Sequence, residues 1–201
     1  MVDEQRPLPV TASEVGFHGR VWDVRRDTVD LGEAGSAVRD YLTHPGAVAI
    51  LALDDRERVL LVRQYRHPVG SFLFELPAGL RDVDGEEPLE VARRELHEET
   101  GYRAERWLTL VDIYLSPGAS AERIRVFLAR GVSPHPDGRP TDLEGEEVGM
   151  PIAWVPLADL VAKAFTGDLH NPSLVTGVLA VESARTDDYA RLRPADAPEA
   201  W

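Results

Sequence analysis

Three glutamates on one predicted helix, Glu95, Glu98 and Glu99, are the residues whose types and spacing indicate chemistry. They stand at positions i, i+3 and i+4, so a helix puts their carboxylates on one face, where like charges repel. A divalent cation reverses that repulsion. Carboxylate oxygens suit Mg²⁺ or Mn²⁺, and substrate phosphates commonly fill the remaining positions around such ions. A solvated acidic helix face is the alternative interpretation, so the three residues alone do not decide the matter.

The residues around these glutamates form a longer pattern. Starting at Gly79, it runs Gly-x(6)-Glu-x(7)-Arg-Glu-Leu-x-Glu-Glu-x-Gly-Tyr and ends at Tyr102. This order resembles the Nudix box at every fixed residue type. It departs from the box by one extra residue before Glu86, in the loop ahead of the helix, where an insertion need not disturb the helical ligands. The resemblance implies a metal-dependent hydrolase of nucleoside diphosphate compounds.

The resemblance also implies roles for the box residues. Glu95 and Glu99 are expected to be the principal metal ligands, with the backbone carbonyl of Ala78 as a further ligand. Glu98 is expected to join where additional ions bind, and it counts among the catalytic residues. We expect two to three Mg²⁺ or Mn²⁺ ions, which lower the pKa of a bound water and offset charge as the P–O bond breaks.

Two more box residues, Glu86 and Arg94, are expected to form a buried pair that braces the loop against the helix. An ordinary helical i,i+4 pair between Glu90 and Arg94 is the alternative.

Features outside the box resemble the ADP-ribose pyrophosphatase branch of the family. They include the segments VRQYR at 62–66 and FELPAG at 74–79. The branch implies that Arg66 and Glu75 contact the ribose or phosphates of the substrate, since a diphosphate needs donors beyond the metals. A surface ion pair on neighbouring strands is the alternative. Pro117, sixteen residues after Gly101, is associated with ADP-ribose preference, and an ordinary turn is its alternative.

The N-terminal segment 19–27 also resembles this branch, in which a strand lobe crosses to a second subunit and an aromatic residue stacks on adenine. Trp22 is the candidate here, because a flat aromatic face offers stacking area at little entropic cost. Packing of Trp22 in a dimer core is the alternative. We therefore expect a homodimer with exchanged N-terminal strands.

A loop from Ser133 to Glu147 is rich in Pro, Gly, Asp and Glu and is long enough to suggest a function. The branch supplies a mobile catalytic glutamate from this place. Among Glu144, Glu146 and Glu147, alignment on the following segment 152–156 favours Glu147 as the acceptor of the water's proton, with Glu146 second. A solvated acidic loop is the alternative.

Predicted helices and strands must position these residues, and the clearest of them is a helix over 88–100. Pro88 suits its first turn, and Gly101 suits the position just after its end. Alternating residues over 15–42 predict a strand pair with a turn at Gly32 and Gly35, and the apolar runs 47–53 and 59–63 predict a buried hairpin. Further strands are predicted at 107–115, 123–129 and 152–155, and further helices at 157–165 and 172–184.

The predicted fold class is therefore α/β: the Nudix resemblance implies an α/β/α sandwich with a mixed sheet, preceded by a small N-terminal antiparallel strand lobe. We expect residues 1–44 to form the lobe, which serves dimerisation and base stacking. Residues 45–185 are expected to form the catalytic domain and 186–201 a C-terminal tail, of which the end, 194–201, is expected to be frayed.

The composition argues against nucleic-acid and membrane partners. The formal net charge is -13, from 35 acidic and 22 basic residues, which disfavours nucleic acid. The longest apolar run is too short to cross a bilayer, so no membrane partner is expected. The chain has no cysteine, which suits a reducing cytoplasm, and its first residues lack a signal-peptide pattern. The six histidines have no metal-ligand spacing and are interpreted as surface or turn residues.

The predicted function is metal-dependent hydrolysis of the diphosphate of ADP-ribose to AMP and ribose 5-phosphate. A Nudix hydrolase of another nucleoside diphosphate derivative, such as a nucleotide sugar, a dinucleotide or an oxidised nucleotide, is the first alternative. A sensor that binds ADP-ribose without cutting it is the second. The intact box carboxylates argue against the sensor.

Overall fold

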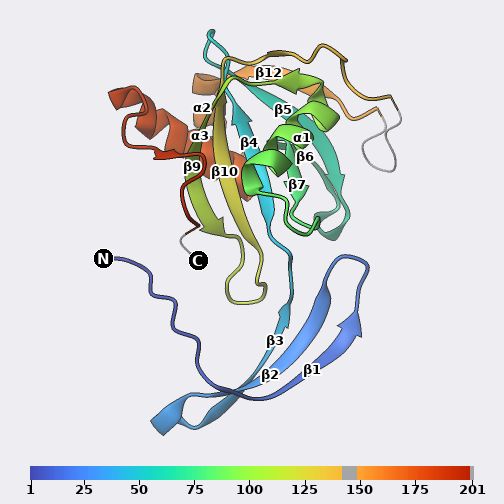
Figure 1. Cartoon of the computed structure of the whole chain (residues 1–201), viewed down its shortest axis with the longest axis vertical. Coiled ribbons are helices and arrows are strands. Elements are labelled where there is room, and N and C mark those ends of the chain that lie inside the picture. The colour runs from blue at the N-terminus through green and yellow to red at the C-terminus, as the bar shows by residue number, and fades with distance from the viewer. Residues whose placement is uncertain (142–148, 200–201) are drawn as a thin grey trace.

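The computed structural model describes residues 1–141 and 149–199 and shows an α/β body joined to a strand lobe (Figure 1). The strands are β1 (Val10–His18), β2 (Asp23–Asp30), β3 (Ser36–Leu42), β4 (Ala47–Ala52), β5 (Arg58–Arg66), β6 (Ser71–Glu75), β7 (Ala78–Leu80), β8 (Tyr102–Arg103), β9 (Arg106–Tyr114), β10 (Arg123–Arg130), β11 (Ser133–Pro134), β12 (Ile152–Pro156) and β13 (Arg193–Pro194). The helices are α1 (Pro88–Thr100), α2 (Leu157–Thr166) and α3 (Pro172–Ala184), with short 3-10 turns η1 (Gly32–Ala34), η2 (His67–Val69) and η4 (Arg185–Asp187).

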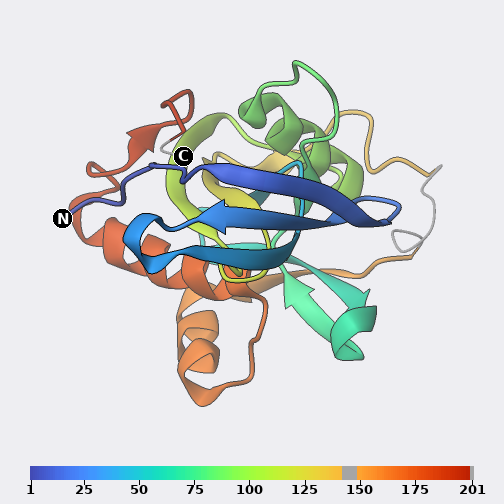
Figure 2. The same cartoon turned by 90° about the horizontal axis from the view of Figure 1, so that it is seen from below.

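The N-terminal lobe is an antiparallel sheet in the order β1-β2-β3. Figure 1 shows it set apart from the body, and Figure 2 shows its three strands side by side, seen from below. The prediction of two strands over 15–42 was wrong, because the lobe has three strands and the first, β1, begins upstream at Val10. Every residue of β1 is exposed, so this strand faces no core and carries no regular apolar alternation to reveal it. The predicted turn at Gly32 and Gly35 is confirmed.

The body is built on a mixed sheet in the order β13-β9-β10-β4-β7, in which the fully buried β4 runs parallel to β10 and antiparallel to β7. Successive β4 side chains point to opposite faces. Leu51 packs in one apolar cluster with Val178 of α3, and Ile50 packs in another with Leu96 of α1. The two helices therefore cover opposite faces of the sheet, and the predicted α/β/α sandwich is confirmed.

The predicted hairpin of 47–53 with 59–63 was wrong. The two runs form β4 and β5, which meet at the single bridge Leu53–Val59 and then lie in different sheets. β5 pairs with β12 and β6 instead. Both runs are apolar on both faces, which indicates that both faces of each strand are covered by other parts of the protein. This hydrophobic pattern does not identify the neighbouring strand with which each run pairs.

The predicted helices are confirmed. α1 spans Pro88–Thr100, and Gly101 follows it in the left-handed region at φ 75°, with its N–H donating to the carbonyl of His97. α2 and α3 lie where they were predicted, and the Oδ1 of Asn171 caps α3 by accepting the N–H of Leu174. Within the described residues, no helix is long and apolar enough to cross a membrane.

The C-terminal segment 193–199 is docked, so the prediction of a frayed tail was wrong for it. β13 pairs with β9, and the fully buried guanidinium of Arg125 donates to the carbonyls of Ala197 and Pro198 at 2.7 and 3.2 Å. Arg125 also holds Asp112 through two bonds of 2.8 and 2.9 Å. Carbonyls of the tail thus complete the partners that a buried guanidinium requires.

Candidate functional site

Helix α1 turns two of the three predicted metal-binding glutamates into the body. Glu95 and Glu99 are 9% and 6% exposed, whereas the side chain of Glu98 is 41% exposed. Oε2 of Glu99 accepts the backbone N–H of Ala78 at 3.0 Å. Because Ala78 opens β7, this bond ties the acidic face of the helix to the strand that precedes the box loop.

Gly79 lets the same strand approach the helix closely. A Cβ at this position would lie 2.0 Å from Oε1 of Glu95, well inside van der Waals contact. Its φ angle is not in the left-handed region, so the space it leaves for Glu95, not its backbone freedom, explains the glycine.

Arg94 is the cation at the centre of the acidic face. Its Nε and Nη2 each donate to a different oxygen of Glu86 at 3.1 Å. Its Nη1 donates to Glu95 at 2.7 Å and to Glu98 at 3.1 Å. The bonds from Arg94 lower the pKa of Glu86, and the same bonds raise the pKa of Arg94. The guanidinium therefore links the box loop to the helix.

The chemistry of this donor set fits a divalent cation. Carboxylates on adjoining helical turns supply hard oxygen ligands, and Gly79 leaves room for one of them against β7. In the part of the chain that the structure describes, no three carboxylate or imidazole side chains already converge to hold a metal. Arg94 instead balances the charge of Glu95 and Glu98. Each bond from Nη1 uses one oxygen of its glutamate, so the second carboxylate oxygen of Glu95 and of Glu98 can still serve as a ligand.

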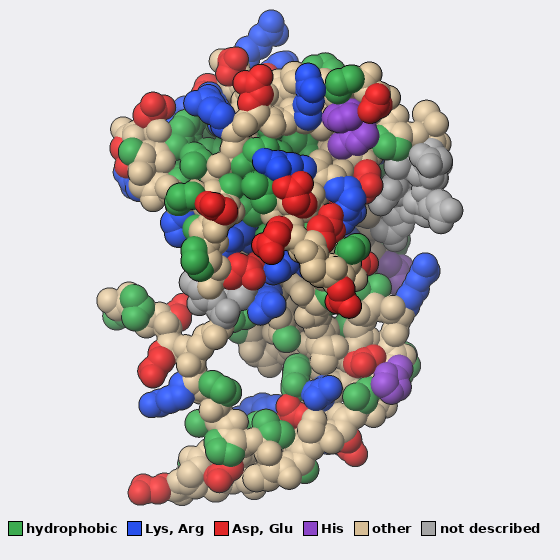
Figure 3. Space-filling model, viewed as in Figure 1, with side chains coloured by type: hydrophobic (Ala, Val, Ile, Leu, Met, Phe, Trp, Pro, Cys, Tyr) green, Lys and Arg blue, Asp and Glu red, His purple; other side chains and the backbone are tan. Residues whose placement is uncertain are grey.

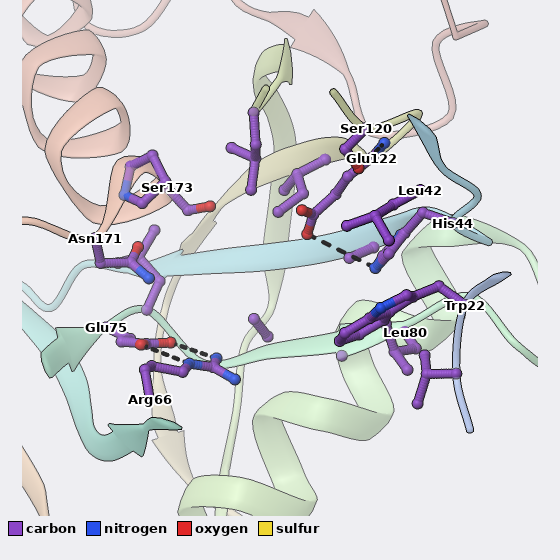
Figure 4. A pocket seen from close by; sticks show the side chains of 18 residues that line it. Trp22, Leu42, His44, Arg66, Glu75, Leu80, Ser120, Glu122, Asn171 and Ser173 are labelled. Atoms are coloured by element: carbon purple, nitrogen blue, oxygen red, sulfur yellow. Dashed lines mark hydrogen bonds and ion pairs between the residues drawn. The ribbon is translucent and has the colours of Figure 1, made fainter. Parts of the chain in front are cut away.

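A cavity of about 480 Å³ opens on the other side of Ala78 and Gly79. That volume lies within the range of small-molecule sites. Its wall combines the end of the lobe, β4, the β5–β6 pair, β7, the loop between β9 and β10, and the start of α3 (Figure 4). The cavity therefore shares β7 with the acidic face of α1.

Arg66 and Glu75 line this cavity as a two-bond ion pair on adjacent strands. Nε and Nη2 of Arg66 donate to Glu75 at 2.8 and 2.6 Å. The Glu75 side chain is 4% exposed and that of Arg66 is 43% exposed. Arg66 thus presents positive charge to the cavity, and Glu75 sits behind it.

Trp22 and His44 lie together in the same cavity (Figure 4). Their rings are stacked with centroids 6.2 Å apart, and Trp22 is 44% exposed. The side chain of His44 is only 7% exposed, so His44 is not the surface residue that one of its two interpretations expected, although it does lie in the turn between β3 and β4, where Nδ1 accepts the N–H of Gly46. Burial lowers the pKa of His44, and the nearby carboxylate of Glu122 offsets this only in part.

Pro117 and the three loop glutamates are the remaining predicted residues. Pro117 is exposed and does not line the cavity, although Glu122 of the same loop does. Glu144, Glu146 and Glu147 fall outside the described residues.

Sequence reasoning missed His44 and Glu122 as cavity residues. The His-Pro-Gly break where the lobe joins the body was a signal for His44. Glu122 is a single acidic residue in a loop, and the sequence gave no comparable signal for it.

Comparisons with known proteins agree with the fold described above and with the resemblance of the box residues. The family model described as NUDIX domain matches residues 43–175. An ADP-ribose pyrophosphatase of Mycobacterium tuberculosis is 42% identical over 185 residues, covering 92% of this chain and 87% of that relative. An ADP-ribose pyrophosphatase of Bacillus subtilis is 41% identical over 122 residues, covering 61% of this chain and 65% of that relative. A solved structure described as an ADP compounds hydrolase has a TM-score of 0.76 and 21% identity, covers 94% of this chain and 100% of that chain, and supports the fold.

Proposed function

Because the chain belongs to the Nudix family, we propose that it hydrolyses the diphosphate of ADP-ribose to AMP and ribose 5-phosphate. One observation carries the proposal. The strand that contacts Glu95 and Glu99 of the box also walls a cavity that holds a cationic side chain, Arg66, and an exposed aromatic ring, Trp22. A charged diphosphate and a flat base need these two kinds of group.

We propose that two to three Mg²⁺ or Mn²⁺ ions are held by Glu95, Glu98 and Glu99, with the carbonyl of Ala78 as a further ligand. When bound, such ions offset the negative charge of the diphosphate and lower the pKa of water. Glu147 takes up the proton of the attacking water, and Glu146 is the second choice. The bonds from Arg94 to Glu86 hold the box loop against the helix that carries the ligands.

In the cavity, Arg66 binds the phosphates through charge-assisted hydrogen bonds. Both oxygens of Glu75 already accept bonds from Arg66. We therefore assign Glu75 mainly to positioning Arg66, which narrows the expectation that Glu75 touches ribose or phosphate. Trp22 stacks on the base, and Pro117 stays a prediction, since it lies away from the cavity wall.

We further propose a homodimer in which the N-terminal lobe, about residues 1–44, packs on a second subunit. The lobe leaves large apolar side chains uncovered, including Val15, Phe17 and Val38 at 36%, 64% and 54% exposure. Figure 3 shows hydrophobic side chains on the face of the lobe that it presents. Apolar surface of this kind marks interaction sites. Trp22 lies in the cavity of its own chain in this structure, so exchange of the strands between subunits stays a prediction, as does a cytoplasmic location.

The substrate is tested by comparing kcat/KM for ADP-ribose, a nucleotide sugar, a dinucleotide and an oxidised nucleotide in excess Mg²⁺. We expect ADP-ribose to be preferred, and reaction in ¹⁸O-labelled water identifies the attacked phosphorus. A higher kcat/KM for one of the other compounds would show that this compound, and not ADP-ribose, is the preferred substrate. The assignment to the Nudix family would be unaffected. Tight ADP-ribose binding without product would instead indicate a sensor.

A further inference from the structure

The box loop, residues 81–87, joins β7 to α1 and contains the extra residue by which this chain departs from the usual pattern. The side chains of residues 82–85 are exposed, including that of Val83 at 56%. A backbone hydrogen bond of 3.2 Å from the N–H of Glu86 to the carbonyl of Val83 closes a turn within the loop. A loop with so little packing depends on contacts at its two ends to hold it in place.

An ion pair holds each end of the box loop. At the end next to α1, Glu86 accepts two bonds from Arg94. At the end next to β7, Nη1 of Arg81 donates to Oε1 of Glu199 at 2.6 Å, and the two side chains are 19% and 21% exposed. Among the described residues, Glu199 is the only hydrogen-bond partner of the Arg81 guanidinium, whose buried Nε has none. This end of the loop therefore depends on a residue 118 positions later in the chain.

Glu199 lies at the end of a segment that is fastened to the sheet independently of the box loop. β13 pairs with β9, and the buried guanidinium of Arg125 donates to the carbonyls of Ala197 and Pro198, directly before Glu199. The backbone that carries Glu199 is thus fixed on the body. Its carboxylate reaches Arg81 from a firm support.

Arg81 directly follows the strand that contacts the acidic face of α1. Its N–H donates to the carbonyl of Gly46 at 3.0 Å, and three residues earlier the N–H of Ala78 donates to Glu99 at 3.0 Å. A shift at this end of β7 changes the spacing between the Ala78 carbonyl and the carboxylates of Glu95 and Glu99. Mg²⁺ demands near-ideal octahedral geometry, so a site of this kind is sensitive to such a shift.

We propose that Glu199 is a positioning residue for the metal site. Acting through Arg81, it holds the end of β7 against α1, so that the carbonyl of Ala78 and the helical carboxylates keep the spacing that a divalent cation needs. This inference rests on the metal ligands of the proposed function and deepens them. The C-terminal segment supports a box loop that is one residue longer than usual.

The test uses Glu199→Gln, which keeps the size of the side chain and removes its charge. Mn²⁺ binding is measured by calorimetry without substrate, and amide hydrogen exchange is measured on the metal-free protein. We expect the Kd for Mn²⁺ to rise about fivefold, the upper end for a pair that is partly exposed. The amides of Ala78 and Arg81 should exchange faster by a similar factor, while the amides of α3 stay unchanged. With saturating Mg²⁺, KM for ADP-ribose should not change.

A charge exchange and a matched control complete the design. Arg81→Glu alone should weaken Mn²⁺ binding at least as much as Glu199→Gln does, because two carboxylates then face each other. Combining Arg81→Glu with Glu199→Arg should restore most of the affinity, since the pair is re-formed with its charges exchanged. Asp196→Asn removes an exposed acid of the same segment and should bind Mn²⁺ as wild type does.

Three results would overturn the inference and leave the proposed function standing. They are wild-type Mn²⁺ affinity and Ala78 exchange in Glu199→Gln, equally faster exchange in α3, and no recovery in the charge-exchanged double variant. Failure of wild type to cleave ADP-ribose in excess Mg²⁺ would defeat the proposed function instead. Mn²⁺ binding and hydrogen exchange need no substrate, so they would still decide the role of Glu199.

Discussion

Replacing Gly79 by alanine should disable the acidic face of α1 while leaving the fold intact. The new Cβ would lie 2.0 Å from Oε1, 2.1 Å from Cδ and 2.4 Å from Cγ of Glu95. Relief of this overlap requires the carboxylate to move by more than about 1 Å, and a displacement of that size at a reacting site costs roughly a hundredfold in rate. That loss corresponds to about 2.7 kcal/mol of transition-state stabilisation.

The stability of Gly79→Ala should change little. Forcing Glu95 away from its preferred rotamer costs about 0.5–1.5 kcal/mol, and alanine recovers about 0.4–1 kcal/mol by restricting the unfolded chain. The assays are kcat/KM for ADP-ribose across a Mg²⁺ titration and unfolding in urea. Gly118→Ala is the matched control, since its Cβ would meet nothing within 4 Å. Wild-type kcat/KM and Mg²⁺ dependence in Gly79→Ala would refute the reasoning, as would global unfolding.

Three further predictions concern the loop base and the buried ion network. Glu147→Gln should lower kcat for ADP-ribose at least about a hundredfold with little change in KM, whereas a larger loss in Glu146→Gln would reverse our choice of base. Arg125→Met should lower the free energy of unfolding in urea by about 3 kcal/mol, because it leaves the buried Asp112 with Arg193 as its remaining partner; an unchanged value would contradict this. Burial alone would raise the pKa of Asp112, but the bonds from Arg125 and Arg193 outweigh it and lower that pKa below its ordinary 3.8. This carboxylate therefore stabilises the fold at pH above 3.8 and loses that effect as pH falls through the lowered pKa, so Asp112→Asn should weaken the loss of stability that follows as the pH falls below 3.8.

Local signals were enough to predict the element that carries the box. Pro88 and Gly101 mark the ends of α1 by their own backbone preferences, and the structure places the helix between them. The shared face of Glu95 and Glu99 follows from helical spacing alone. That Arg94 also binds Glu95 and Glu98 through Nη1 depends on side-chain rotamers, and helical spacing does not determine these.

Features that depend on distant partners could not be predicted. The tail is held by Arg125, about seventy residues earlier, through backbone carbonyls that leave no mark in the side-chain pattern. His44 and Glu122 meet because a loop docks on the end of the lobe, which neither segment reveals by itself. The partners of β4 likewise come from β10 and β7, and its apolar run shows only that it is buried.

Metal-dependent cleavage of ADP-ribose by the box glutamates is tested by incubating wild type and Glu99→Gln with ADP-ribose and Mg²⁺. The products are identified by chromatography, and unfolding curves are recorded for both proteins. We predict AMP and ribose 5-phosphate from wild type, none when the metal is chelated, and almost none from a folded Glu99→Gln. Full turnover by Glu99→Gln, or intact ADP-ribose after incubation with wild type in excess Mg²⁺, would contradict the claim.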